Sequence, residues 1–197
     1  MSRRWLLVAF VVGLGAVAAL ASFDARAWDR ALDRGDRAYA ETPRRARWNA
    51  DTRLPGDPVG RALRVEGKVA LRRALRAFLV AERTPRGFDN GERRAEARAA
   101  AAGALVAVAA GDDRQLASRA YDLLGVLAAT GDSIDNEQAL AAFEAAVRAD
   151  GANADAKYNL ELLLRRTRAS DLRRGEGSGS GPRGGRGAGA ADAGSGY

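Results

Sequence analysis

The 197-residue sequence contains neither cysteine nor histidine. These absences exclude disulfide bonds, zinc held by Cys or His, haem attached through cysteine, a cysteine nucleophile and a histidine general base. The sequence also lacks a phosphate-binding loop, a nucleophile elbow and a complete dinucleotide-binding glycine pattern. Its adjacent carboxylates Asp112 and Asp113 stand at an expected helix start, where capping explains them. We therefore predict that the protein is not an enzyme and needs neither a metal nor a cofactor.

Lysine is almost absent: Lys68 and Lys157 are the two lysines, and the rest of the 32 basic residues are arginines. The net charge of the chain is +7. Such a balance ordinarily suggests nucleic acid or an anionic membrane as a partner. Along the chain, however, the arginines alternate with acids, as in Asp29-Arg30, and are not gathered in one block. We expect that nucleic acid is not a partner. The alternative is a basic binder of nucleic acid or anionic lipid that uses the arginine-rich helices and residues 183–187.

A long uncharged run occupies residues 5–23, which are nineteen residues bounded by arginines before it and Asp24 after it. As a helix it would be about 28 Å long, close to the ~30 Å hydrocarbon core of a bilayer. Trp5 and Phe23 stand at its two ends, where aromatic residues anchor membrane helices. We predict a transmembrane anchor within residues 1–24.

Two features of this anchor stay open on sequence alone. A cleavable signal peptide is the alternative, with candidate sites after Ala21 and Ala27. The N-terminal arginines favour a cytoplasmic N-terminus and an extracytoplasmic helical domain, but four arginines at positions 26–37 favour the reverse. We choose the first orientation, which makes the protein a single-pass membrane protein with an exported domain.

The rest of the chain divides into three segments. Residues 25–60 read as a charged juxtamembrane helix followed by a linker rich in proline and glycine. Residues 61–172 show helical periodicity with no sustained period of two, which predicts an all-α domain with helices near 63–83, 92–110, 112–130, 135–150 and 154–170. Asp112, Asp135 and Asn153 are the expected caps of the last three helices. Residues 173–197 form a glycine-rich tail that we expect to be disordered.

The last helices carry a repeated spacing. In one pair the matching positions are Tyr121, Leu124, Gly125, Ala139, Phe143 and Ala146, with Gly151 at the following turn; the next unit starts at Ala154 and contains Tyr158-Asn159-Leu160. This pattern resembles the tetratricopeptide repeat family over residues 113–170, which implies stacked antiparallel helical hairpins. Helices near 63–83 and 92–110 would be an earlier, degenerate unit. An ordinary alanine-rich helical bundle is the alternative.

Two departures from the family pattern have structural consequences. Ala139 follows Gly125 by fourteen positions where the family has twelve, so the intervening turn must hold two extra residues. Glu161 replaces the small residue expected in the second unit, so its helix would serve as the polar end of the stack.

A wider likeness appears when the anchor is included. Strings that contribute to it are 54–58 (LPGDP), 72–78 (RRALRAF), 87–91 (GFDNG) and 156–164 (AKYNLELLL). The chain resembles small single-pass bacterial repeat proteins of the kind encoded beside MoxR-type AAA ATPases and von Willebrand factor A domain proteins. The resemblance implies a scaffold or adaptor that binds protein partners in a membrane-associated complex of that kind, with no small-molecule substrate.

The repeat register also predicts which side chains line the binding groove. The expected lining residues are Arg119, Asp122, Val126 and Ala129 in one unit, and Asp155, Tyr158, Leu162 and Arg165 in the next, with Asn159 beside them. An extended peptide would bond to the Asn159 amide, while Arg119 or Arg165 pairs with its carboxylates. The alternative for Tyr158 is packing against a neighbouring helix.

Overall fold

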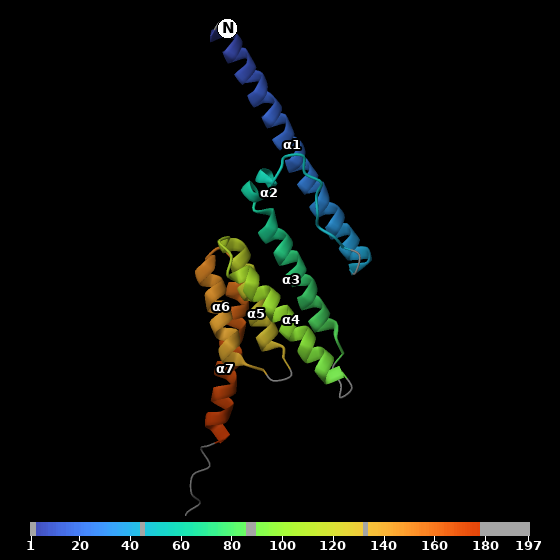
Figure 1. The fold of residues 1–197 in the computed structure, drawn as a ribbon. Coiled ribbons are helices and arrows are strands. Elements are labelled where there is room, and N and C mark those ends of the chain that lie inside the picture. Colours follow the sequence, from blue (N-terminus) through green and yellow to red (C-terminus); the bar gives the residue numbers. More distant parts are fainter. Residues whose placement is uncertain (1–2, 44–45, 86–89, 132–133, 178–197) are drawn as a thin grey trace, which may run out of the picture.

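A computed structural model describes residues 3–43, 46–85, 90–131 and 134–177. Within these ranges the chain forms seven helices and no strand (Figure 1). The helices are α1 (Arg3–Glu41), α2 (Pro58–Ala62), α3 (Val65–Arg83), α4 (Gly91–Ala109), α5 (Arg114–Ala129), α6 (Asn136–Ala149) and α7 (Ala154–Gly177). The predicted all-α class is confirmed. Most of the tail predicted to be disordered, residues 178–197, lies outside the described residues.

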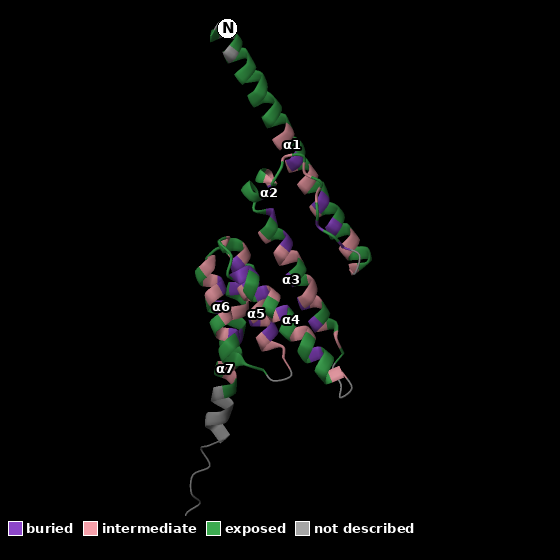
Figure 2. Cartoon of the chain, viewed as in Figure 1, coloured by how far each residue is buried: buried purple, intermediate pink, exposed green. Residues whose placement is uncertain are grey.

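Helix α1 joins the expected anchor and the juxtamembrane helix into one unbroken helix of 39 residues. It is the one helix in the described part of the chain that is long and apolar enough to cross a bilayer. Its first half projects away from the rest of the molecule (Figures 1 and 2). Side chains there are exposed, including Phe10 at 68% and Leu14 at 60%. Exposure of such large apolar side chains fits a lipid environment better than water.

The segment after α1 turns back and runs beside it; we call residues 46–54 the strap (Figure 1). At one end of the strap, Trp48 Nε1 donates a 2.8 Å hydrogen bond to Asp36 Oδ1. The indole lies against Gly35, where a Cβ would come within 2.3 Å of Trp48 Cδ1. At the other end, the fully buried Asp24 accepts from the backbone N–H groups of Arg53 at 2.8 Å and Leu54 at 2.9 Å. The expected linker is therefore packed against α1 over this stretch.

Two further contacts connect α1 to the following helices. Asp57 caps α2 by accepting from Gly60 N at 2.9 Å, and it also accepts from Trp28 Nε1 at 3.1 Å. Farther along α1, Asp36 receives two hydrogen bonds from the Arg72 guanidinium of α3, at 2.8 and 2.9 Å. Carboxylate hydrogen bonds therefore connect the second half of α1 to the helical domain, together with an apolar cluster in which α1 residues pack against Trp48, Val65 and Val69.

Helices α3 to α7 form the main bundle, in which consecutive helices are antiparallel. Arg98 in the first half of α4 contacts Glu82 near the end of α3 at 3.1 Å. Ser118 near the start of α5 donates to the Ala146 carbonyl near the end of α6 at 2.8 Å. Small residues allow this close packing: a Cβ on Gly125 of α5 would lie 2.5 Å from Phe143 Cε1 of α6. The core is correspondingly rich in alanine.

Alternate helices of the bundle are parallel to one another. Thr130 at the end of α5 donates to Glu82 near the end of α3 at 3.1 Å. Ser118 in the first turns of α5 accepts from Asn153 Nδ2, at the start of α7, at 2.9 Å. Helices α3, α5 and α7 therefore point the same way, with α4 and α6 running in the opposite direction.

Helix starts follow the predicted capping with one shift. Asp135 caps α6 by accepting from Gln138 N at 2.9 Å, and Asn153 accepts from Ala156 N at 3.1 Å at the start of α7. For α5 the cap is Asp113, one residue later than the expected Asp112. At its other end α7 continues to Gly177, past the boundary that we placed at residue 172.

Candidate protein-binding groove

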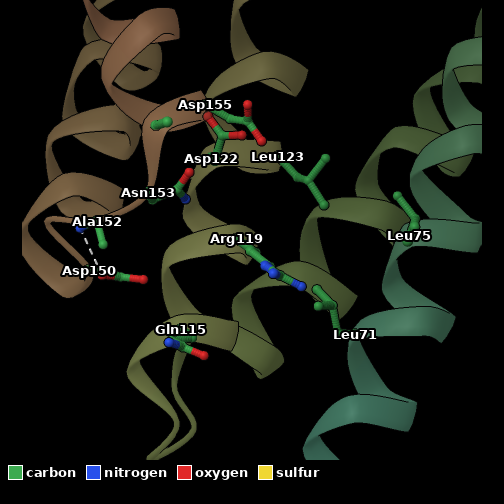
Figure 3. Close-up of a pocket in the computed structure, with 11 residues that line it drawn as sticks. Leu71, Leu75, Gln115, Arg119, Asp122, Leu123, Asp150, Ala152, Asn153 and Asp155 are labelled. Atoms are coloured by element: carbon green, nitrogen blue, oxygen red, sulfur yellow. Dashed lines mark hydrogen bonds between the residues drawn. The ribbon is translucent and has the colours of Figure 1, made fainter.

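An open groove with a cavity volume of about 570 Å³ lies between α3, α5 and the start of α7 (Figure 3). Its lining residues come from three places in the chain. They are Leu71 and Leu75 of α3, Gln115, Arg119, Asp122 and Leu123 of α5, and Asp150, Ala152, Asn153, Ala154 and Asp155 at the α6–α7 turn and the start of α7. Leucines form one side and acidic residues the other, with Arg119 between them (Figure 3).

Three of the predicted groove residues line this cavity: Arg119, Asp122 and Asp155. The Arg119 side chain extends from α5 toward Leu71 of α3 (Figure 3). The side chain is exposed and forms no ion pair with another described residue, so its guanidinium is available to a ligand.

Asn159 lies beside the cavity and is already bonded within the protein. Its Nδ2 donates to Asp122 Oδ1 at 2.9 Å, linking α7 to α5. One amide hydrogen and the amide oxygen remain after that bond. The Asn159 side chain therefore holds Asp122 through one N–H group and can still offer its other N–H group and its oxygen to a ligand.

The other predicted groove residues lie elsewhere. Tyr158 and Leu162 are 66% and 52% exposed on α7, so the alternative in which Tyr158 packs against a neighbouring helix is not what the structure shows. Arg165 pairs with Glu161 one turn earlier on the same helix. Val126 and Ala129 pack against the cluster of Ala139, Phe143 and Leu163 between α6 and α7, outside the cavity lining.

Asp122 is half-buried in the groove, where burial and a neighbouring acid act on its carboxyl. Burial raises the pKa of this carboxyl above its ordinary value, the hydrogen bond from Asn159 opposes that change, and the charge of Asp155 adds to the increase. The groove thus holds two acids close enough to affect one another. A cationic group on a partner would be attracted to that side of the groove.

Sequence reasoning missed the residues that fix the groove's shape. Ser118 is fully buried, donates to α6 and accepts from Asn153, so one hydroxyl joins α5, α6 and α7. Leu71 and Leu75 were missed because the register covered the last two units, whereas these leucines come from α3. Their spacing of four along an apolar face was the available signal.

Comparison with protein-family models, curated proteins and solved structures finds no match for this chain. The resemblance to tetratricopeptide repeats and to the MoxR-associated proteins stays a prediction from the quoted residues. In the described residues no group of three acidic side chains is arranged to hold a metal ion. The expectations about enzymatic activity, cofactors and partners stay predictions as well.

Proposed function

We propose that this protein is a membrane-anchored adaptor that binds a protein partner in the groove between α3, α5 and α7. The observation that carries the proposal is the parallel arrangement of these three helices around an open cavity in which Arg119 has no ion-pair partner among the described residues. Leucines on one side offer apolar contact, and charged groups at the centre and the opposite side fix orientation. The proposed occupant is an extended peptide, because the cavity is open to solvent and presents apolar and charged side chains from α3, α5 and the start of α7 side by side.

The spacing of contacts supports a repeat architecture. Ser118 bonds to Asn153 and Asp122 bonds to Asn159, separations of 35 and 37 residues. A tetratricopeptide repeat has a period of about 34 residues, and two extra residues in the predicted turn bring it to about 36. Gly125 lies against Phe143, as the close helix approach in that family requires. We therefore propose a short tetratricopeptide-like array with α7 as its terminal helix.

The anchor supports a place in a membrane complex. The exposed apolar half of α1 is the basis for a single-pass protein, and the resemblance noted above suggests a bacterial complex with a MoxR-type ATPase and a von Willebrand factor A domain protein. The proposed orientation keeps the N-terminus cytoplasmic. The chain has no cysteine, so a single cysteine can report on which side of the membrane its position lies. In intact cells an impermeant maleimide should label an Ala152→Cys variant, in the helical domain, and should not label a Ser2→Cys variant, at the N-terminus.

Position-specific crosslinking in cells tests the groove. A photoreactive benzoylphenylalanine replaces Leu123 in the groove or, as the matched control, the 55% exposed Val106 of α4, which is not a lining residue. We expect a discrete crosslinked protein from position 123 only, and its loss when Arg119→Glu is added. Equal crosslinking from both positions, or none from position 123, would contradict the proposed groove.

A further inference from the structure

The arginines that follow the apolar run form one stripe along α1, although they alternate with acids in the sequence. At about 100° per residue, positions 26, 30, 34 and 37 fall within an arc of roughly 80° that also contains Phe23. All four arginines are exposed. The buried face of this half of α1, which includes Asp24, Ala31 and Gly35, lies on the other side of the helix. The stripe therefore lies on the side of α1 opposite its buried face.

Hydrogen bonds turn the arginine side chains toward the apolar half of the helix. Arg30 Nε donates to the Arg26 carbonyl at 3.1 Å, and Arg34 Nε donates to the Arg30 carbonyl at 3.2 Å. Arg37 Nε bonds to the Asp33 carbonyl in the same way at 3.3 Å. Each bond runs one turn back along α1, which directs the guanidinium groups toward the membrane end.

The strap adds one more arginine at the end of the apolar run. The Arg53 guanidinium carbon lies 3.8 Å from the centroid of the Phe23 ring, and that of Arg30 lies 5.9 Å from it. Asp24 determines this position, because it holds the backbone N–H groups of Arg53 and Leu54. Among the described residues Arg26, Arg30 and Arg53 form no ion pair. The Arg30 and Arg53 guanidinium groups therefore gather around Phe23, and Arg26 follows Phe23 by one turn within the same arc of α1.

The height of these arginines above the apolar run separates them into two groups. Arg26 begins about 4 Å and Arg30 about 10 Å beyond Phe23, at 1.5 Å per residue. The headgroup layer on each side of the hydrocarbon core is roughly 5–7 Å thick. Arg26 begins within that layer, and Arg30 and Arg53 reach it because their guanidinium groups lie near the Phe23 ring. Arg34 and Arg37 begin about 16 and 21 Å beyond Phe23, outside it.

We propose that Arg26, Arg30 and Arg53 form a binding site for the phosphate of an anionic phospholipid, with Phe23 at the boundary between headgroup and acyl chain. The planar guanidinium binds phosphate oxygens through paired N–H groups, and stacking on Phe23 leaves the N–H edge of Arg53 free for that bond. The nearby Asp29 and Asp33 fall on the adjoining face of α1, between this arc and the face that contacts α3. This site rests on the proposed membrane anchor.

Lipid selectivity of the full-length protein in vesicles tests the site. The protein is reconstituted in phosphatidylcholine vesicles with a trace of spin-labelled phosphatidylglycerol or spin-labelled phosphatidylcholine. Electron spin resonance then gives the fraction of each lipid immobilised at the protein. We expect preferential immobilisation of phosphatidylglycerol over phosphatidylcholine. Removal of each arginine of the site should decrease this preference roughly two- to fivefold, because one arginine near the membrane surface contributes about that factor.

Matched pairs of substitutions locate the effect. Arg30→Gln with Arg53→Gln should remove most of the preference, whereas Arg34→Gln with Arg37→Gln removes the same charge and should leave it unchanged. Arg53→Lys, which retains the charge without the planar stack, should give an intermediate preference. Equal losses from both double variants would overturn the site in favour of a general surface charge, and absence of any preference in the unmodified protein would also overturn it.

Two controls separate this site from the anchor and from another polyanion. Flotation of the protein with pure phosphatidylcholine vesicles tests the anchor alone, so its failure would reject the proposed function and not merely the headgroup site. Displacement of the spin-labelled phosphatidylglycerol by soluble RNA at equal phosphate concentration would overturn a lipid-specific site. We expect RNA to leave the immobilised fraction unchanged.

Discussion

The juxtamembrane region and the main bundle are held together by different kinds of contact. In the first, single carboxylates at positions 24, 36 and 57 accept hydrogen bonds from indoles and backbone amides across about 12 to 30 residues of sequence. In the bundle, small residues let helices approach, and the buried cluster is dominated by alanine and leucine. The strap thus combines a few carboxylate hydrogen bonds with a small apolar cluster of Ala46, Trp48, Val65 and Val69, whereas the bundle helices pack through small apolar side chains along their length.

The largest effect should come from Trp48→Ala in the strap. This change removes the most buried indole and its bond to Asp36, and truncation of such a side chain costs about 3–5 kcal/mol. We expect the loss to be limited to the strap and the start of α3, because Trp48 packs with Val65 and Val69 there, while the main core of the bundle is a separate cluster. Hydrogen–deuterium exchange should show faster exchange in residues 46–54 and unchanged protection in α5 and α6.

A matched control for this change is Trp48→Phe, which keeps a large ring but cannot donate to Asp36. It should weaken the strap less than alanine does. Equal acceleration of exchange in the strap and in α5 would contradict the separation of the two regions.

Gly125→Val should act on the bundle and spare the strap. Its Cβ would meet three atoms of the Phe143 ring at 2.5 to 2.8 Å, so the α5–α6 pair must shift. Such overpacking costs about 1–3 kcal/mol. Thermal unfolding of the detergent-solubilised protein should show a lower midpoint of the bundle transition.

The control for that substitution is Gly103→Ala on α4, where an added Cβ meets no atom within 4 Å. Alanine should leave stability unchanged or raise it by up to about 1 kcal/mol, since it favours helix more than glycine does. A destabilised Gly103→Ala variant would indicate that helix contacts around α4 differ from those described.

The smallest effect concerns Asp122 and pH. Because burial raises its pKa in the folded protein, the ionised carboxylate disfavours the fold. The stabilisation of the fold by the protonated Asp122 carboxyl is complete below pH 3.8, the ordinary pKa, and is lost as the pH rises through the raised pKa of the folded protein. Asp122→Asn keeps an acceptor for Asn159 and removes the charge, so it should be more stable than the unmodified protein at neutral pH.

Measurement of the unfolding free energy against pH checks this sign. The advantage of Asp122→Asn should shrink on acidification through the raised pKa and vanish below 3.8. An advantage that grows with acidification would be inconsistent with a raised pKa at Asp122.

Part of the candidate groove could be predicted from the sequence. The predicted tetratricopeptide-like register named Arg119, Asp122 and Asp155, and all three side chains lie in the cavity lining. Tyr158 and Leu162 were placed in the same groove by the register, but they are exposed on α7 and do not line the cavity. The register assigns a side chain to a face of one helix, and it does not say how far along that face the neighbouring helix extends.

The amino-acid sequence by itself determined the all-α class, the uncharged run and the caps at Asp135 and Asn153. These features depend on composition and on spacings of a few residues, which act within a single helix. Only the tertiary structure decided that Asp24 is buried, that Arg53 lies over Phe23 and that Leu71 shares a groove with Asp155. These neighbours are about 30 to 84 residues apart in the chain, and the packing of the helices, which local pattern does not encode, brings them together.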